Sequence, residues 1–357
     1  MRLELLPRTD VTPIKRALAP LWAIGFALLI GAGLVILLGR SPLAAFKVYF
    51  LEPLTDPWAL QELAVKATPL IIIATGLVYC FRANLWNIGA EGQLIMGAIV
   101  GSIVPLATVD LESAAWVLPL SLVLGILGGA LYGAIPALLR NRFGVSEILV
   151  SLMLVYIAEL TLDYLVRGPW RDPKGFNFPT TPSFPDFALL PNLASEGRLH
   201  AGLLIALLGA VMTWFVFGRT MFGFGIRVAG EAPRAARFAG FNAPKMTLIA
   251  FLISGGMAGL AGIVEVTGQI GQLKPAISGG LGFTAIIVAY LGRLHPVGII
   301  FGAFTIALTI YGGEAAQIAL KLPLDLTRTF QGILLFCVLA ADALTTYRLR
   351  LVTGAHA

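Results

Sequence analysis

Long apolar runs without a charged side chain are the feature that most limits how this chain can fold. The run from Ser113 to Leu139 contains no Asp, Glu, Lys or Arg, and the same holds from Ala17 to Gly39. Each run can cross a bilayer as a helix, which takes about 20 residues. No small-residue cleavage site follows the first run, so we expect an uncleaved span. The sequence therefore predicts an all-α integral membrane protein.

The low content of charged residues excludes an ordinary soluble domain. Only 12% of the residues are charged and 58% are hydrophobic, whereas soluble domains carry about 25% charged residues. The net charge of +6 comes from 25 Lys and Arg against 19 Asp and Glu. Because the basic residues mostly lie in short segments between apolar runs, they indicate membrane topology and not a nucleic-acid partner.

We expect about ten transmembrane helices. They lie at residues 18–39, 61–81, 88–109, 114–139, 146–166, 200–218, 245–266, 281–292, 296–313 and 328–346. The segments at 88–109 and 281–292 are the weakest, because Glu91 interrupts the first and the second is too short to cross alone. With both termini in the cytoplasm, most Lys and Arg residues fall on the inner side, as the positive-inside rule requires.

Two segments between the predicted spans are long. Residues 167–199 contain several prolines and should form an irregular extracytoplasmic loop. Residues 219–245 form the longest internal loop, which is basic and should face the cytoplasm.

The first of two broken segments lies at residues 84–93. It places Asn84, Asn87, Glu91 and Gln93 between two apolar runs, with glycines on both sides of the glutamate. Polar side chains at membrane depth are tolerated only where protein or water satisfies them. The segment is therefore either a re-entrant turn that lines a pathway or a buried polar joint between helices.

The second broken segment lies at residues 268–283. It contains Gln269, Gln272 and several glycines, and a short apolar stretch follows it. Paired discontinuous helices in the two halves of a chain are the sequence clue to a repeated transporter architecture with a central path. We therefore predict two discontinuous or re-entrant segments and an internal two-fold repeat.

The cytoplasmic loop contains a short basic helix. Pro233 suits the first helical turn, and Gly240 suits the position just after a helix end. Arg234 and Arg237 lie one turn apart between them, followed by Phe238. Asn242 and Pro244 then resemble the N-cap and first turn of the next span. This helix is either a docking site for a partner or a solvated connector that keeps positive charge inside.

Glu159 and Asp163 lie four residues apart on one face of the fifth predicted span. They could line a pathway, but we expect Asp163 at the outer interface and Glu159 buried. Trp86 and Tyr290 could stack on a solute base or serve in packing. Cys80 and Cys337 lie in apolar runs and form no metal-binding pattern.

No enzyme motif occurs in the sequence. It lacks the GxxxxGK[ST] phosphate-binding loop, HExxH and GxSxG. The three histidines, His200, His295 and His356, are scattered. We therefore expect no catalytic residues, no metal and no cofactor in this chain, and any ATP hydrolysis in a separate subunit.

Three motifs together resemble permease subunits of bacterial ABC importers. They are Asn87-Ile-Gly-Ala-Glu91-Gly-Gln93, the stretch from Gly230 to Gly240, and the stretch from Gly282 to Pro296. The group serves branched-chain amino acids, ribose-type sugars and nucleosides, and the first motif looks most like its nucleoside and simple-sugar branch. The resemblance covers about residues 15 to 347.

The resemblance implies a type II-like importer permease, with residues 1–357 forming one transmembrane domain in the bacterial inner membrane. It implies a second permease subunit, two cytoplasmic ATPase subunits that bind ATP and Mg²⁺, and an extracytoplasmic solute-binding protein received by the loop at 167–199. Membrane lipid surrounds such a protein, and no nucleic acid is involved.

The resemblance also implies roles for the unusual segments. The helix at 231–240 would be a coupling helix seated in a groove of an ATPase, with these ATPase-coupling residues: Glu231, Arg234, Arg237, Phe238 and Gly240. The broken segments would border the solute path, with these candidate residues: Asn84, Asn87, Glu91, Gln93, Gln269 and Gln272. The function expected is ATP-driven uptake of nucleosides. The alternatives are uptake of ribose-type simple sugars and ion-coupled secondary transport.

Overall fold

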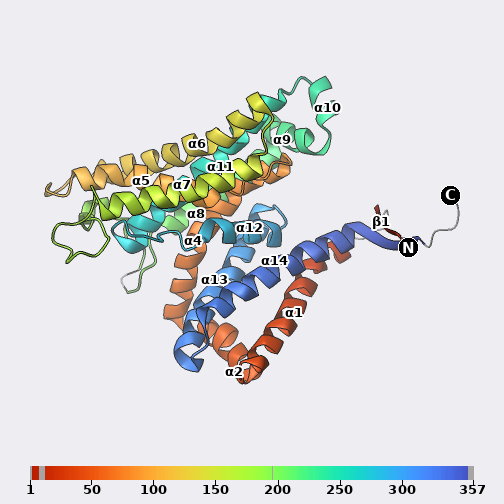
Figure 1. Cartoon of the computed structure of the whole chain (residues 1–357), viewed down its shortest axis with the longest axis horizontal. Helices are drawn as coiled ribbons and strands as arrows, with labels where there is room; N and C mark the ends of the chain where they lie inside the picture. The colour runs from red at the N-terminus through yellow and green to blue at the C-terminus, as the bar shows by residue number, and fades with distance from the viewer. Residues whose placement is uncertain (1, 8–12, 195, 353–357) are drawn as a thin grey trace. The chain divides into compact units, whose positions relative to one another are not determined.

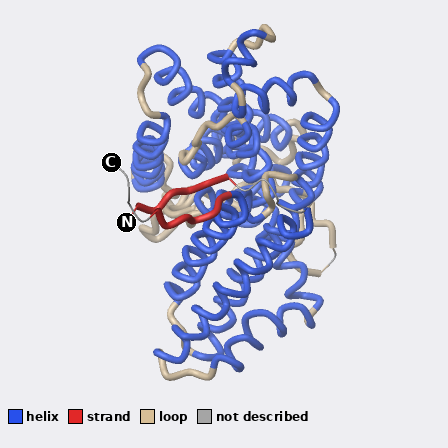
Figure 2. The backbone as a smooth tube through the Cα atoms, turned by 90° about the vertical axis from the view of Figure 1, so that its right-hand side faces the viewer, coloured by secondary structure: helices blue, strands red, loops and turns tan. Residues whose placement is uncertain are grey.

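The computed structural model describes residues 2–7, 13–194 and 196–352, and they form two compact units. The terminal unit comprises residues up to Asp56 together with those from Leu308 onward, and the central unit comprises Pro57–Ala307. Helices make up most of the described chain (Figure 2). This confirms the predicted all-α class.

The terminal unit is built on two long helices, α1 (Pro13–Leu37) and α14 (Leu324–Thr346), which pack against each other. Between them along the chain come α2 (Pro42–Phe46), the π-helix η1 (Lys47–Leu51), α3 (Glu52–Thr55) and the second part of α13 (Pro296–Leu320). Strands β1 (Arg2–Pro7) and β2 (Tyr347–Val352) pair antiparallel, with Glu4 opposite Arg350. We did not expect these strands, although both sequences alternate apolar and charged residues, which is the strand period.

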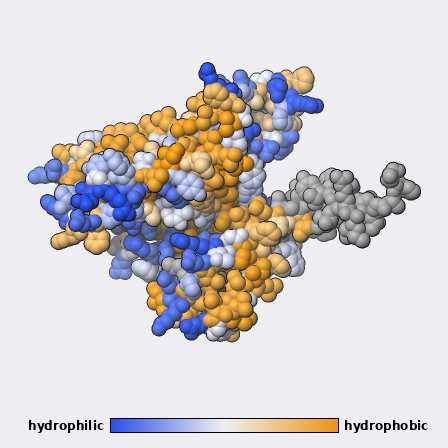
Figure 3. Space-filling view, viewed as in Figure 1, coloured by the Kyte–Doolittle hydropathy of each residue, from blue (hydrophilic) through white to orange (hydrophobic). Residues whose placement is uncertain are grey.

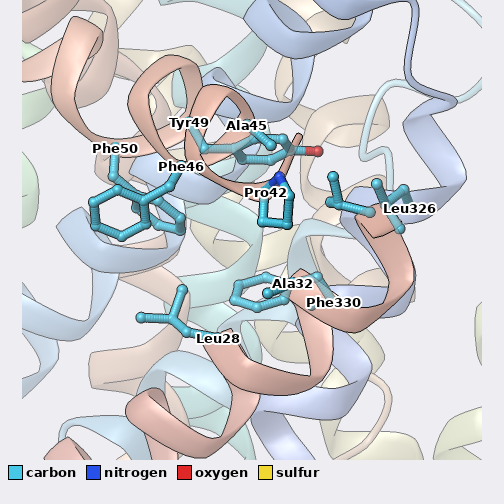
Figure 4. A pocket seen from close by; sticks show the side chains of 11 residues that line it. Leu28, Ala32, Pro42, Ala45, Phe46, Tyr49, Phe50, Leu326 and Phe330 are labelled. Carbon is cyan, nitrogen blue, oxygen red and sulfur yellow. The ribbon is translucent and has the colours of Figure 1, made fainter. Parts of the chain in front are cut away.

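A small apolar pocket of about 80 Å³ lies inside the terminal unit. Leu28 from α1, Phe46 from α2 and Phe330 from α14 project toward it (Figure 4). The hydroxyl of Tyr49 lies 3.1 Å from that of Thr327, which links η1 to α14. Because its lining is apolar, this pocket offers little to a polar solute.

The central unit contains most of the predicted spans. Its helices are α4 (Pro57–Arg82), α5 (Ala90–Ala107), α6 (Val117–Phe143), α7 (Glu147–Arg167), η2 (Asp186–Ala188), α8 (Gly202–Arg219), α9 (Met221–Glu231), α10 (Pro233–Phe238), α11 (Ala243–Glu265), η3 (Val266–Ile270), α12 (Leu281–Leu291) and the first part of α13 (Pro296–Leu320). All ten predicted spans coincide with helices in the two units.

Seven of the described helices are long and apolar enough to cross a membrane: α4, α5, α6, α7, α8, α11 continued by η3, and α13. The stretch Leu21–Leu37 of α1 and the 11-residue α12 are apolar but shorter. As predicted, α12 cannot span a bilayer by itself.

Helices α5, α6, α7 and α11 run side by side (Figure 1). Helix α4 is buried, and it packs against α8, α11 and α12. Glycines allow the backbones of α5, α6 and α11 to touch. A Cβ on Gly259 would overlap the backbone of Gly125 and Gly129, and a Cβ on Gly97 would overlap Gly259. Small residues permit such approach where lipid supplies no hydrophobic driving force. The glycines therefore serve the close packing of α5, α6 and α11.

The outer surface of α6 is apolar, with Leu120, Val123, Leu127 and Leu131 exposed along it. Figure 3 shows mostly orange, hydrophobic residues over this region, and blue, hydrophilic residues among paler ones at the tip formed by α10. An apolar band of this kind suits contact with lipid acyl chains.

Candidate functional site

The first broken segment begins where α4 ends. The N–H of Asn84 donates to the Phe81 carbonyl at 3.1 Å, and the N–H of Leu85 donates to Cys80 at 2.9 Å. With φ of 55° at Asn84, this is the Schellman arrangement, in which a left-handed residue closes a helix end. Asn adopts that conformation more readily than most residues. The structural role of the exposed Asn84 is therefore to cap the end of α4.

Asn87 and Gln93 form a buried polar joint. Asn87 Nδ2 donates to Gln93 Oε1 at 2.8 Å and to Ser254 Oγ at 3.0 Å, and Gln93 Nε2 donates back to Asn87 Oδ1 at 3.0 Å. The N–H of Gly89 also donates to Asn87 Oδ1. Both side chains are at most 1% exposed. Their polar groups are used within the protein, which ties the broken segment to α5 and α11.

Glu91 joins the two broken segments. Its Oε1 accepts from the N–H of Gly280 at 2.8 Å, and its Oε2 accepts from the N–H of Gly282 at 2.5 Å. Gly282 packs so closely that a Cβ there would overlap the backbone of Glu91. The carboxylate thus lies in the first turn of α5 and at the start of α12. Two helix N-termini, each carrying partial positive charge, converge on it.

A cavity of about 540 Å³ opens beside Glu91. Helices α5 and α7 and the segment before α12 line it: Glu91, Ile95, Tyr156, Glu159, Leu160, Leu162, Asp163, Pro275, Ala276, Ile277, Ser278, Gly279 and Gly280. Three of these residues are acidic, and Asp163 pairs with Arg167 at 2.7 Å. The cavity therefore offers carboxylate oxygens that can accept hydrogen bonds from a neutral solute.

The prediction that Glu159 is buried was wrong. Its side chain is exposed on α7 at the edge of the cavity. Helix α7 packs mainly on α5, so the face that carries Glu159 is left open in the single chain. A charged residue midway along a spanning helix does not face lipid. Water or another protein surface must therefore cover this face.

Gln269 and Gln272 lie apart from the cavity lining. Gln269 is in the π-helix η3, and Gln272 follows Gly271, whose φ is 73°. Both are partly buried, and neither lines the 540 Å³ cavity. The structure thus brings Glu91 to a cavity but does not bring the two glutamines there.

The short helix in the long internal loop forms as predicted. Helix α10 begins at Pro233, and Gly240 closes it with φ of 83° while the N–H of Phe241 donates to Ala236. The Asn242 side chain accepts from the N–H of Lys245, which confirms the predicted N-cap of the next helix. These caps fix a compact helix on the surface of the central unit.

The residues proposed for ATPase coupling are presented outward. Glu231, Arg234, Arg237, Phe238 and Gly240 are all exposed, and Phe238 is 94% exposed. A phenylalanine so fully exposed beside two arginines is a typical anchor for a protein partner.

Trp86 and Tyr290 pack on each other. Their rings stack at 5.9 Å with 20° between planes, and Phe81 contacts both. The three rings connect the end of α4, the broken segment and α12. Packing between helices is therefore the role that the geometry supports for this pair.

The loop at 167–199 is tied to the second broken segment. The backbone N–H groups of Thr181, Phe184 and Leu190 donate to carbonyls of Leu273, Gly271 and Thr267. Arg198 forms a bidentate pair with the buried Glu62 on α4, at 2.9 and 2.6 Å.

His200, just beyond this loop, is 2% exposed, and burial lowers its pKa. Its Nδ1 accepts from the N–H of Gly202.

Sequence reasoning missed several of these partners. Ser254 completes the Asn87 joint, Gly280 and Gly282 bind Glu91, and Glu265 is buried near Lys66, Lys274 and Arg198. Only Glu265 carried a sequence signal, as an acidic residue at the end of a predicted span. No group of three or more His, Cys, Asp or Glu able to hold a metal occurs among the residues that the structure describes.

The family model for the branched-chain amino acid transport system / permease component matches residues 59–339. A glucose ABC transporter permease of Haloferax volcanii, TsgB13, is 35% identical over 98% of this chain and 93% of that protein. Two guanosine ABC transporter permeases of Bacillus subtilis are also similar. NupP is 30% identical over 96% of this chain and 97% of its own length, and NupQ is 32% identical over 70% and 80%.

The matched region contains the whole central unit except its first two residues, and so includes Glu91, the cavity and α10. These relatives are permease subunits of ABC transporters. By this match over most of its length, the chain belongs to the permease component family of the branched-chain amino acid transport system.

Proposed function

We propose that this chain forms the membrane path of an ABC importer for nucleosides. The observation that carries the proposal is the acidic cavity at the meeting point of the two broken segments, in a bundle of apolar helices. Carboxylates accept hydrogen bonds from hydroxyl and amine groups. A nucleoside supplies hydroxyls from its ribose and N–H groups from its base.

Relatives that are guanosine permeases favour nucleosides, and the relative that is a glucose permease favours a simple sugar. Sugar uptake is therefore the second candidate function. Both solutes are neutral, which suits a cavity that would repel anions. Ion-coupled secondary transport is not favoured, because the relatives are ABC transporter permeases.

Of the six residues expected to border the solute path, Glu91 is the one that we retain. It lines the cavity directly, and the exposed Glu159 and Asp163 join it. Asn87 and Gln93 would act indirectly, by holding the start of α5. Asn84 would shape the turn before it.

The complete importer would contain a second permease, two cytoplasmic ATPases and an extracytoplasmic binding protein. The open face of α7 with Glu159 would meet water and the second permease, and the two guanosine permeases of Bacillus subtilis suggest that this partner is a different chain. With both termini cytoplasmic in the bacterial inner membrane, α10 would face the ATPase and the loop at 167–199 the binding protein.

The substrate is tested by uptake of labelled adenosine, ribose, glucose and leucine into a strain lacking this gene, with and without the gene restored. We expect restoration of ATP-dependent adenosine uptake alone. Restoration of a sugar without adenosine would establish the second candidate function. Uptake that survives ATP depletion but collapses with an uncoupler would overturn the ABC mechanism.

The coupling role of α10 is tested by reversing its charge with Arg234→Glu and Arg237→Glu together. We expect the protein to insert normally, the ATPases to hydrolyse ATP, and uptake to be lost. Arg142→Glu is the matched control, because Arg142 is an exposed arginine at the end of α6. Unchanged uptake by the double variant would refute the coupling role.

A further inference from the structure

We propose that Arg82 is a positioning residue that transmits movement from α9 and α10 to α12, and so to the cavity beside Glu91. The inference rests on the proposed ABC function, because it assumes that a partner ATPase moves α10. It concerns a residue at the end of a buried helix, outside the three motifs that identify the family.

Arg82 holds the turn that follows α12. Its Nε and Nη2 both donate to the carbonyl of Leu294, at 3.2 and 2.9 Å. The guanidinium also lies over the Phe217 ring of α8, 5.1 Å from its centre. A single half-buried side chain thus contacts the ends of three helices: α4, α8 and α12.

The turn that Arg82 holds has an unusual backbone. Arg293 and Leu294 have φ of 55° and 53°, so two consecutive non-glycine residues are left-handed. This conformation is unfavourable for residues with a Cβ and persists only where the surroundings impose it. The N–H of Leu294 donates to Ala289, and its carbonyl is held by Arg82. The position of this carbonyl is therefore fixed from both sides.

Helix α9 rests directly on the backbone of Arg82. Gly230 packs there so closely that a Cβ would overlap the Arg82 carbonyl and Ala83. One turn earlier, Ile226 is fully buried in a cluster with Tyr79 and Leu85. Helix α10 follows α9 with only Ala232 between them. Displacement of α10 along with α9 must therefore move the end of α4 or break this contact.

Helix α12 connects Arg82 to the cavity. It is 11 residues long, or about 16 Å at 1.5 Å per residue. Beyond its end, the Leu294 carbonyl binds Arg82, and at its start Gly282 binds Glu91. Tyr290 in its last turn packs on Phe81 and Trp86. A helix this short moves as a rigid body, so movement at Leu294 shifts the segment 278–280, which lines the cavity just before α12.

The test uses the complete complex, purified through a tag on this chain and reconstituted in vesicles. Arg82→Gln removes the charge and both bonds, whereas Arg82→Lys keeps a cation. Gly230→Ala introduces the overlapping Cβ. The matched controls are Arg142→Gln, at an exposed arginine, and Gly218→Ala, where a Cβ meets nothing within 4 Å.

We expect Arg82→Gln to assemble with the ATPases and to hydrolyse ATP within about twofold of wild type, while solute transported per ATP falls at least tenfold. Arg82→Lys should recover part of this ratio, and Gly230→Ala should lower it. Both controls should match wild type. A purely structural residue would lower the amount of complex and leave the ratio per complex unchanged.

A fluorescent label reports the movement itself. Ala276→Cys, at the exposed edge of the cavity, and Ala235→Cys, on α10, accept a thiol-reactive dye, and the native Cys80 and Cys337 are buried. With Arg82 intact, ATP should change the signal from both positions. With Arg82→Gln, only the label at position 235 should respond.

Three outcomes would overturn the role of Arg82. The first is a wild-type ratio of solute transported per ATP in Arg82→Gln. The second is an ATP-induced signal at position 276 that is the same in Arg82→Gln as with Arg82 intact. The third is loss of assembly in both Arg82 variants. If instead wild type shows no ATP-driven uptake, or charge reversal on α10 has no effect, the proposed function fails independently of Arg82.

Discussion

Glu91→Gln measures how much the carboxylate at the meeting point of α5 and α12 contributes to the stability of the protein. The two oxygens of Glu91 accept from two different backbone N–H groups, those of Gly280 and Gly282. Glutamine has the same shape but only one carbonyl oxygen. Its amide nitrogen would face a second N–H, so one buried donor would lose its partner.

The expected cost follows from these bonds. A hydrogen bond to a charged group contributes about 1.5–3 kcal/mol, and a buried donor left unsatisfied costs about 1–3 kcal/mol. Loss of negative charge at two helix N-termini adds about 0.3–1 kcal/mol for each. Removing a charge that is only 2% exposed recovers desolvation energy and offsets part of this. We expect a net loss of about 2 kcal/mol, or about 30-fold in the folding equilibrium.

The measurement is reversible unfolding of the purified protein in mixed detergent micelles. Glu159→Gln is the matched control, because it removes a carboxylate from the same cavity but from a side chain that is exposed at its edge. We expect this control to stay within about 0.5 kcal/mol of wild type, as is usual for an exposed position. If the two variants lose equal stability, the charge of the cavity matters and the helix-end bonds do not. If Glu91→Gln matches wild type, the reasoning from those bonds is refuted.

Three further predictions concern stability. Gly259→Ala should lower the free energy of unfolding by about 1–3 kcal/mol, because the added Cβ would overlap the backbone of α6 at Gly125 and Gly129. Gly218→Ala, where the Cβ meets nothing within 4 Å, should leave it unchanged, and thermal unfolding of both variants measures the difference. Arg198→Gln should cost about 1–3 kcal/mol in thermal unfolding, because it leaves the carboxylate of Glu62, which is only 2% exposed, without its charged partner, although solvent reaches the half-exposed Arg198. Burial lowers the pKa of His200 below its usual 6.5, so the free energy of unfolding should fall as pH drops below about 6.5. His200→Asn should remove that slope in a pH series of melting curves, and an unchanged slope would exclude this histidine.

Local features of the sequence were predicted well. Apolar runs located all ten predicted spans, and the short helix α10 formed between Pro233 and Gly240 with Asn242 as the next N-cap. Each of these depends on residues within one or two turns of each other. A proline at a first turn and a glycine after a last turn act through their own backbone. Their effect can therefore be predicted without knowing the rest of the fold.

Distant partners could not be predicted. Asn87 finds Ser254 and Glu91 finds Gly282 across more than 160 positions of sequence. Nothing in the first segment specifies which residue of the second will contact it. The exposure of Glu159 was mispredicted for the same reason, because burial of a helix face depends on how many neighbours pack on it. Helix α7 has few.

The broken segment at 84–93 shows how residues that look alike in the sequence take either a structural role or a place beside the cavity. Its polar residues looked equivalent in the sequence, yet Asn84 closes α4, Asn87 and Gln93 satisfy each other, and Glu91 borders a cavity. A polar side chain serves a passing solute only if it has access to open space. Neither Asn87 nor Gln93 lines the 540 Å³ cavity, whereas Glu91 does. Glu91 also uses its oxygens within the protein, for the N–H groups of Gly280 and Gly282 and for the Ser278 side chain. A carboxylate has about four lone-pair sites, so about one remains for a solute in the cavity. For this reason we propose solute contact for the acidic residues and structural support for the amides.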